Sequence, residues 1–292
     1  MTATALLSVD FEDWHQLVRR RVGDRDWERP GTALDRQIDA LLSLLDELGV
    51  RATFFILGMA ARAHPRLVDA VVRAGHEVAS HGDIHRPVSR QSADEFAADL
   101  AAARRTIAEL TGRGPIGYRA PAFSITRECP WAYEVLAEQG FSYDASQHDS
   151  PRVRGRMAPV SADPHRLWLT AERSLWEFPA AVWHVGGLPL PVGGASYWAV
   201  MPRAVVLHGL TRAGCFPGIY LHPHEFDPAP LRAGLAPQAG VAQRAHARVR
   251  AAQRNNARRA APEVLRAIAR RFRLIPYGEA YVQLSDGTPA GS

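Results

Sequence analysis

The feature that most constrains the fold of this chain is a repeated unit: an amphipathic helix, a glycine, a short apolar strand and then a polar residue. The first helix is predicted over about 33 to 48, where apolar residues recur at helical spacing before Gly49. The strand that follows is "ATFFIL" at 52 to 57. A continuously apolar run of this kind is typical of a strand buried on both faces of a parallel sheet.

The same unit recurs further along the chain. A helix near 65 to 74 ends at Gly75 before "HEVAS", another opens with the capping box Ser92 to Glu95, and a third ends at Gly140 before "FSYDAS". Successive units predict an α/β fold with a mostly parallel sheet, commonly closed into a barrel, and the alternative is an open doubly wound sheet. No GxGxxG or GxxxxGK(S/T) follows the first strand, which argues against the nucleotide-binding open sheets.

The pattern breaks over about 147 to 175, a polar stretch that predicts a long loop or excursion. Strand-like runs return as "LWEFPAAVW" and "GIYLHP", and a helix is predicted over 202 to 213. A last helix, over roughly 241 to 271 with a break at Pro262, is expected to close the chain.

Length and composition fit one globular domain. Barrels of alternating strands and helices often reach 292 residues as a single domain, and 47% hydrophobic with 22% charged residues argues against wholesale disorder. Because no linker interrupts the chain, we expect one domain over 1–292, of which 229–292 is a basic C-terminal extension.

The formal net charge of +5 comes from arginine, since the chain has no lysine. Much of the excess lies between Arg232 and Arg273, and such a run can attract phosphates, nucleic acid or an anionic membrane face. The ordinary interpretation is a solvated helix face. We expect no nucleic-acid partner, we allow a peripheral contact with a membrane-linked glycan, and the sequence indicates no particular oligomeric state.

The cysteines and the apolar runs of the sequence indicate the cellular compartment of the protein. Cys129 and Cys215 lie far apart and form no CxxC pattern, which argues against a disulfide framework and a cysteine-based zinc site. The N-terminus lacks the basic start and apolar core of a secretion signal, and no apolar run approaches the roughly 18 to 20 residues that cross a bilayer. We therefore expect a cytoplasmic protein.

Polar side chains gather where the predicted strands end. In a (β/α) barrel the carboxyl ends of the strands converge on the face that carries the active site. The strand ends "SVDFED", "ASHGDIH", "GYRAP", "SYDAS" and "YLHPHE" supply these candidates: Asp10, Glu12, Asp13, His81, His85, Arg119, Asp144, His222 and His224.

His81 and His85 stand four residues apart, a spacing that shares one face of a helix. With one carboxylate they make three protein ligands and leave a position for water, as in catalytic zinc sites. Asp10, Glu12 and Asp13 repel one another unless a cation compensates. Taken singly, these residues also fit two loop histidines with ordinary hydrogen bonds and an acidic cluster that caps a helix.

Three further candidates have two interpretations each. Arg119 can pair with a carboxylate through its planar fork or can fix a loop. His222 follows an apolar run, which suits a general acid or base, although a histidine beside a strand is more often structural. Asp144 can orient His222 or cap the next turn.

Together and in this order, these segments resemble the motifs of the polysaccharide deacetylase family, also called the NodB homology family or carbohydrate esterase family 4. The resemblance runs from about Leu6 to Pro228, with "SVDFED", "SHGDIH", "RAPAF", "YDAS" and "YLHP" as the five motifs. "DFEDWHQL" and "HPHEFDP" look like the branch found with exopolysaccharide and exosortase gene clusters, and "PVGGASYW" and the basic end resemble its C-terminal extension. The resemblance implies an irregular (β/α) barrel of the NodB type with a helical C-terminal extension.

The resemblance also implies a metal site formed by His81, His85 and one carboxylate of the first motif. Aligning "DFED" on the family's "TFDD" makes Glu12 the base and Asp13 the ligand. Aligning it on relatives with D-x-D makes Asp10 the base and Glu12 the ligand. We favour Asp10 as the base, with Asp13 completing the metal shell and Glu12 as a further catalytic candidate.

The remaining roles follow from the same resemblance. Arg119 would hold the base ionised, His222 would protonate the departing amine, and Asp144 would tune His222. Leu221 would line the pocket for the acetyl methyl group.

Aromatic residues and departures from the motifs bear on the substrate. Trp14, Tyr197 and Trp198 can stack on sugar rings, although burial in the core is their more frequent use. Gly82 stands where the family usually has Ser or Thr, and Phe123 where many members have glycine. These departures concern the shape of the substrate more than the reaction.

We therefore predict a metal-dependent hydrolase that removes acetyl from an N-acetylhexosamine in a surface polysaccharide or its precursor, with Zn²⁺ as the expected ion. One alternative keeps the barrel and the metal but hydrolyses a small non-sugar amide or cyclic imide. The other is a non-catalytic carbohydrate-binding scaffold whose basic tail docks to an anionic partner.

Overall fold

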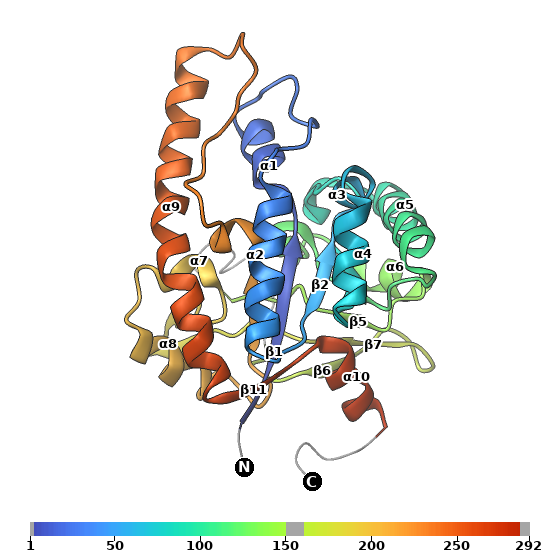
Figure 1. The fold of residues 1–292 in the computed structure, drawn as a ribbon. Helices are drawn as coiled ribbons and strands as arrows, with labels where there is room; N and C mark the ends of the chain where they lie inside the picture. Colours follow the sequence, from blue (N-terminus) through green and yellow to red (C-terminus); the bar gives the residue numbers. More distant parts are fainter. Residues whose placement is uncertain (1–2, 150–160, 287–292) are drawn as a thin grey trace.

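A curled, mostly parallel sheet forms the centre of the molecule, and helices cover its outer face (Figure 1). The computed structural model describes residues 3–149 and 161–286. The strands are β1 (Ala3–Phe11), β2 (Thr53–Ile56), β3 (Glu77–Ser80), β4 (Gly117–Tyr118), β5 (Tyr143–Asp144), β6 (His165–Trp168), β7 (Ser174–Glu177), β8 (Trp183–Val185), β9 (Leu188–Leu190), β10 (Gly218–Leu221) and β11 (Phe272–Ile275).

The helices connect these strands and pack around them. They are α1 (Trp14–Arg21), α2 (Leu34–Glu47), α3 (Gly58–Ala63), α4 (Pro65–Arg73), α5 (Ala93–Thr111), α6 (Ala132–Glu138), α7 (Ala195–Trp198), α8 (Arg203–Leu210), α9 (Val241–Ala269) and α10 (Tyr277–Ser285), with short 3-10 turns η1 (Val88–Arg90), η2 (Pro121–Phe123) and η3 (Pro223–Phe226). None of the helices in the described ranges is both long and apolar enough to span a bilayer.

The strand order explains why the sheet curls. The sheet runs β10-β1-β2-β3-β4-β5-β7-β6, with β11 beside the first half of β1, and its pairs are parallel except β6 with β7. After β7 the chain returns to the other end of the sheet, where Ala180 bridges Gly218 of β10 and the amide of Ala181 donates to the Gly218 carbonyl at 2.9 Å. This confirms the predicted irregular (β/α) barrel.

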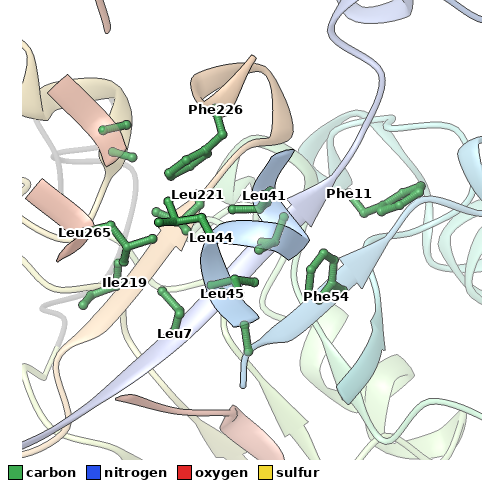
Figure 2. Close-up of a cluster of buried hydrophobic side chains, with 14 of the residues drawn as sticks. Leu7, Phe11, Leu41, Leu44, Leu45, Phe54, Ile219, Leu221, Phe226 and Leu265 are labelled. Atoms are coloured by element: carbon green, nitrogen blue, oxygen red, sulfur yellow. The ribbon is translucent and has the colours of Figure 1, made fainter. Parts of the chain in front are cut away.

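Apolar packing fixes the strands whose ends carry the polar candidates. Figure 2 shows side chains of α2, such as Leu41 and Leu44, meeting Leu221 of β10 and Phe226 of η3, with Leu265 of α9 beside them. Each fully buried leucine of this kind contributes about 1.5–3 kcal/mol to stability. The ends of β1 and β10 are therefore held by a rigid core.

Several predicted elements are confirmed. The helix expected over 33 to 48 is α2, and the strand expected over 52 to 57 is β2. The capping box is present, because the Ser92 hydroxyl accepts from the Glu95 amide and the Glu95 carboxylate accepts from the Ser92 amide at 2.9 Å. Gly112 ends α5 with a φ of 74°, a conformation that glycine adopts at no steric cost.

The prediction was wrong at Pro262, where α9 continues instead of breaking. A proline inside a helix removes one backbone hydrogen bond and costs about 3 kcal/mol. Buried side chains on both sides of it, Ala261, Val264 and Leu265, pack into the core and offset that cost.

The prediction was also wrong about the end of the chain and about 147 to 175. The chain does not close with α9, because β11 returns to pair with β1 and α10 follows it. Part of the supposed loop is strand β6, which pairs antiparallel with β7. Residues 150–160 of that stretch lie outside the described residues.

Candidate active site

The carboxyl ends of four strands bring together most of the sequence-predicted residues. Asp10 and Glu12 come from the end of β1, His81 follows β3, Arg119 follows β4 and His222 follows β10. Parallel strands direct these ends to one edge of the sheet, as expected for a barrel. His85 joins them from the loop after β3.

Glu12, His81 and His85 form a cluster that fits a metal ion. One ligand atom of each lies within 4.8 Å of the others, and Glu12 Oε2 is 3.8 Å from His81 Nε2 and 3.1 Å from His85 Nε2. His81 Nδ1 lies 2.8 Å from the Arg119 carbonyl, so it donates there and leaves the lone pair of Nε2 facing Glu12. Two histidine nitrogens with one carboxylate are a donor set of catalytic zinc sites.

The histidines also perturb Glu12. Burial alone raises the pKa of Glu12, but the neighbouring imidazoles of His81, His85 and His222 outweigh burial and lower it well below its ordinary value. Glu12 is therefore held as a carboxylate, the form that binds a cation.

The two histidines meet through a loop and not through the helix face that their spacing suggested. Residues 81 to 87 contain no helix, and the chain turns through left-handed backbone at Gly82, with a φ of 80°, and at His85, with a φ of 55°. The Asp99 carboxylate of α5 holds this turn by accepting from the Asp83 amide at 2.9 Å. A left-handed histidine is uncommon, and such conformations collect at functional sites.

Asp13 does not join the cluster. Its carboxylate caps α1, accepting from the His15 amide at 2.8 Å, and it also accepts from the Gly31 amide. Burial raises the pKa of Asp13, but these partners outweigh burial and lower it. The structure therefore places Glu12, in place of Asp13, beside His81.

Asp10 is paired with Arg119. The Arg119 Nη1 donates to Asp10 Oδ1 at 2.7 Å and to the Ser8 hydroxyl at 2.7 Å, and Arg119 is fully buried. Its other nitrogens donate to the Ala145 carbonyl and to the Tyr277 hydroxyl, both at 3.1 Å. A buried arginine whose three side-chain nitrogens all donate hydrogen bonds holds Asp10 in a fixed position.

His222 lies between two groups of carboxylates. Its Nε2 is 3.7 Å from Glu12 Oε1 and 3.9 Å from Asp10 Oδ2, and its Nδ1 is 3.3 Å from Glu225 Oε1. Burial lowers the pKa of His222, but Glu225, Glu12 and Asp10 outweigh it and raise the pKa to about 9. Conversely, burial raises the pKa of Glu225, and His222 and its neighbours lower it to about 2.

The partner of His222 is therefore Glu225, and not Asp144 as the sequence suggested. Asp144 instead accepts from the Ser146 hydroxyl at 2.6 Å and pairs across the sheet with Glu177. Burial raises the pKa of both carboxyl groups, and the charge of Asp144 raises that of Glu177 further. Sequence reasoning missed Glu225 and Glu177, although Glu225 stands three residues after His222 in "HPHEFDP".

The three residues predicted to contact substrate differ in exposure. Leu221 is fully buried in the core (Figure 2) and Trp14 is 3% exposed against Val18 and α9, so the structure places both inside the protein. Tyr197 is half-buried beside Gly194 and Tyr220, so part of its surface is exposed. Trp198 is 1% exposed, and its indole donates to the Val192 carbonyl at 2.8 Å.

Two protein families match consecutive parts of the chain. Residues 31–142 match the polysaccharide deacetylase family, and residues 147–280 match a domain of unknown function designated DUF3473. A peptidoglycan deacetylase-like protein of Gibberella zeae is 33% identical over 112 residues, which is 37% of this chain and 32% of that protein. The peptidoglycan deacetylase of Helicobacter pylori is 32% identical over 109 residues, 37% of this chain and 36% of that protein. The alignments thus span about a third of these relatives.

Solved structures share the fold over nearly the whole chain. A protein assigned as a polysaccharide deacetylase in Mycobacterium smegmatis has a TM-score of 0.64 at 20% identity, covering 100% of this chain and 93% of that one. An allantoinase has a TM-score of 0.62 at 15% identity, covering 99% and 92%. A pseudoenzyme of carbohydrate esterase family 4 from Bacillus anthracis has a TM-score of 0.52 at 13% identity, covering 96% and 66%.

The chain therefore contains a polysaccharide deacetylase domain of the NodB homology type, and the DUF3473 region is its C-terminal extension. The match to this extension covers residues 147–280, and the basic segment that we expected from 229 stays a prediction.

Proposed function

We propose that this protein is a metal-dependent deacetylase that hydrolyses the N-acetyl group of an N-acetylhexosamine in a surface polysaccharide or its precursor. The observation that carries the proposal is the cluster of Glu12, His81 and His85, with Asp10 and His222 beside it. The named activities of the relatives in Gibberella and Helicobacter support the same class of substrate.

A divalent ion held by Glu12, His81 and His85, which we expect to be Zn²⁺, would supply Lewis-acid polarisation of the acetyl carbonyl and a more acidic water. Glu12 thus takes the ligand role that we had given to Asp13. Asp10 becomes the base, because its ion pair with Arg119 fixes it in position and it lies at the same strand end.

The two proton transfers of the reaction give each remaining group a role. Asp10 accepts a proton from the water whose oxygen attacks the acetyl carbon. His222 donates a proton to the nitrogen as the carbon–nitrogen bond breaks, which releases acetate and a free amine. Glu225, which lies against Nδ1 of His222, orients the ring and stabilises its protonated form.

A second candidate function is hydrolysis of a small amide or cyclic imide. We consider it because the fold is similar to that of an allantoinase. A third candidate function is that of a non-catalytic carbohydrate-binding scaffold. We consider it because the fold is similar to that of a pseudoenzyme. The complete set of metal ligands, base and acid argues for catalysis over binding alone. Location in the cytoplasm and contact with a membrane-linked glycan remain proposals that accompany the first function.

Acetate release from N-acetylglucosamine oligomers tests the proposal. The wild-type protein is expected to release acetate, and the H81A/H85A variant is expected to lose at least about 100-fold in rate, which is typical of losing a catalytic group. The matched control is H165A/H246A, which removes two histidines outside the cluster and is expected to keep the rate. Turnover of allantoin alone would favour the amide alternative, and glycan binding without any turnover would favour the scaffold.

A further inference from the structure

A cavity of about 300 Å³ is lined by residues around α1 and the start of the C-terminal segment, and its walls carry an excess of positive charge. Its lining residues are His15, Arg19, Arg29, Pro30, Thr32, Arg232 and Gly234. His15 joins the cavity to the strand end, because its Nδ1 lies 3.2 Å from Asp13 Oδ1 and its Nε2 lies 3.1 Å from the Arg232 carbonyl.

Arg19 is the most unusual residue of this cavity. It is only 5% exposed, and its guanidinium donates to the carbonyl of Gly234 at 2.7 Å and to the carbonyl of Arg29. Over residues 3–149 and 161–286, no carboxylate forms an ion pair with Arg19. Burial and the charge of Arg29 lower the pKa of Arg19, and the charges of Asp13, Asp24 and Asp26 offset only part of this effect. A charge buried beside a like charge is costly unless an anion compensates it.

The nearest acids are already occupied. Asp13 accepts from two backbone amides and lies against His15, and Asp24 accepts from the Ala236 amide at 2.8 Å and from the Asp26 amide at 3.1 Å. Both carboxylates are therefore engaged by backbone amides. The free donor capacity of the cavity belongs to Arg29 and Arg232, whose side chains are exposed.

The surrounding surface strengthens the positive potential. Arg232 also lines a second cavity of about 440 Å³, whose other walls include Arg244 and Arg248 of α9. Residues 228 to 262 contain seven arginines and no Asp or Glu. A concave surface lined by one sign of charge concentrates ions of the opposite sign.

We propose that the cavity formed by Arg19, Arg29 and Arg232 is a binding site for a phosphate or diphosphate group. The arginine fork matches the oxygens of a phosphate with two parallel hydrogen bonds, and three arginines around one cavity suit a group that carries more than one negative charge. Such a group can belong to a soluble phosphate ester, such as a nucleotide-linked sugar, or to a lipid headgroup. The site does not depend on the deacetylase proposal.

Calorimetric titration with inorganic pyrophosphate tests the site on the intact protein. The wild type is expected to bind, with an affinity that falls as salt rises. R29A/R232A removes two exposed side chains and is expected to bind at least about tenfold more weakly. The matched control is R203A/R212A, which removes the same charge from exposed positions of α8 and the turn after it and is expected to bind like the wild type.

Two further titrations identify the source of the phosphate. Tighter binding of UDP-N-acetylglucosamine than of pyrophosphate indicates that the natural ligand is a soluble phosphate ester. Binding to phosphatidylglycerol vesicles indicates a lipid headgroup. Either result supports the site if the R29A/R232A variant no longer binds that ligand. No binding of pyrophosphate by the wild type at millimolar concentration, or equal binding by R29A/R232A, overturns the proposal. Acetate release from neutral oligomers by the same variant reports separately on the deacetylase activity and is expected to be unchanged.

Discussion

Glu225 Oε1 lies 3.3 Å from Nδ1 of His222, on the side of the ring that faces away from Asp10 and Glu12. The same carboxylate accepts from the His222 amide at 2.8 Å, so one residue fixes both the backbone and the ring of His222. In the proposed reaction, this pairing gives Glu225 the positioning role that the family resemblance had implied for Asp144.

Replacing Glu225 by Gln is expected to lower kcat by about tenfold or more and to leave KM nearly unchanged. The reason is that the amide keeps the shape of the side chain and removes the charge that stabilises protonated His222. Acetate release at several substrate concentrations separates kcat from KM. Asp144→Asn is the comparison, because Asp144 does not contact His222. An equal loss in the two variants would contradict the role of Glu225.

Replacing Asp13 by Ala is expected to lower the free energy of unfolding by about 1–2 kcal/mol, because Asp13 caps α1. Bound metal is expected to stay near the wild-type level, since Glu12 and the histidines are intact. Chemical denaturation and metal analysis measure the two quantities. Glu12→Gln is expected to show the reverse, with metal lost and stability little changed. Loss of metal in the Asp13 variant would restore Asp13 as a ligand.

Replacing Gly82 by Ser, the residue type usual in the family, is expected to destabilise the protein. The φ of 80° is strained for any side chain, and a Cβ at this position would lie 2.7 Å from Asp99 Oδ2, which holds the histidine turn. We expect a loss of at least about 1 kcal/mol together with weaker metal binding. A thermal unfolding scan and a metal titration measure both effects. Unchanged stability and metal affinity would show that the turn tolerates a side chain.

Stability is expected to fall in acid because of His76. Burial and the charge of Arg51 lower its pKa to about 4, and its Nδ1 accepts from the Ala52 amide at 3.2 Å, so the neutral ring is required. Because the folded pKa lies below the unfolded value, this contribution is complete above about pH 6.5 and is lost as the pH falls toward 4. We expect it to amount to about 1–2 kcal/mol, since part of the group is solvated.

The variant His76→Asn isolates that contribution. Asparagine keeps an acceptor for the Ala52 amide but does not titrate. The unfolding free energy of this variant is therefore expected to change less between pH 7 and pH 4.5 than that of the wild type. Parallel slopes for the two proteins would assign the acid sensitivity to other groups.

The sequence predicted the elements whose signals are local. The period of α2, the apolar run of β2 and the capping box at Ser92 depend on neighbouring residues, and the structure contains all three. Pro262 and β11 could not be predicted in this way, because distant packing keeps α9 intact and pairing with β1 defines β11.

The same distinction applies to the site. Ordered motifs at strand ends indicated which segments would meet, since a parallel sheet directs these ends to one edge. They did not indicate which carboxylate would face His81, because Glu12 and Asp13 are adjacent and the turn into α1 decides between them. The pairing of Asp144 with Glu177 depends on strand register across the sheet, which no motif encodes.

Metal analysis of the purified protein tests the central claim most directly. The account predicts about one divalent ion per chain in the wild type, loss of that ion in H81A/H85A together with acetate release, and retention of both in H165A/H246A. Equal metal content in the wild type and H81A/H85A would contradict the account.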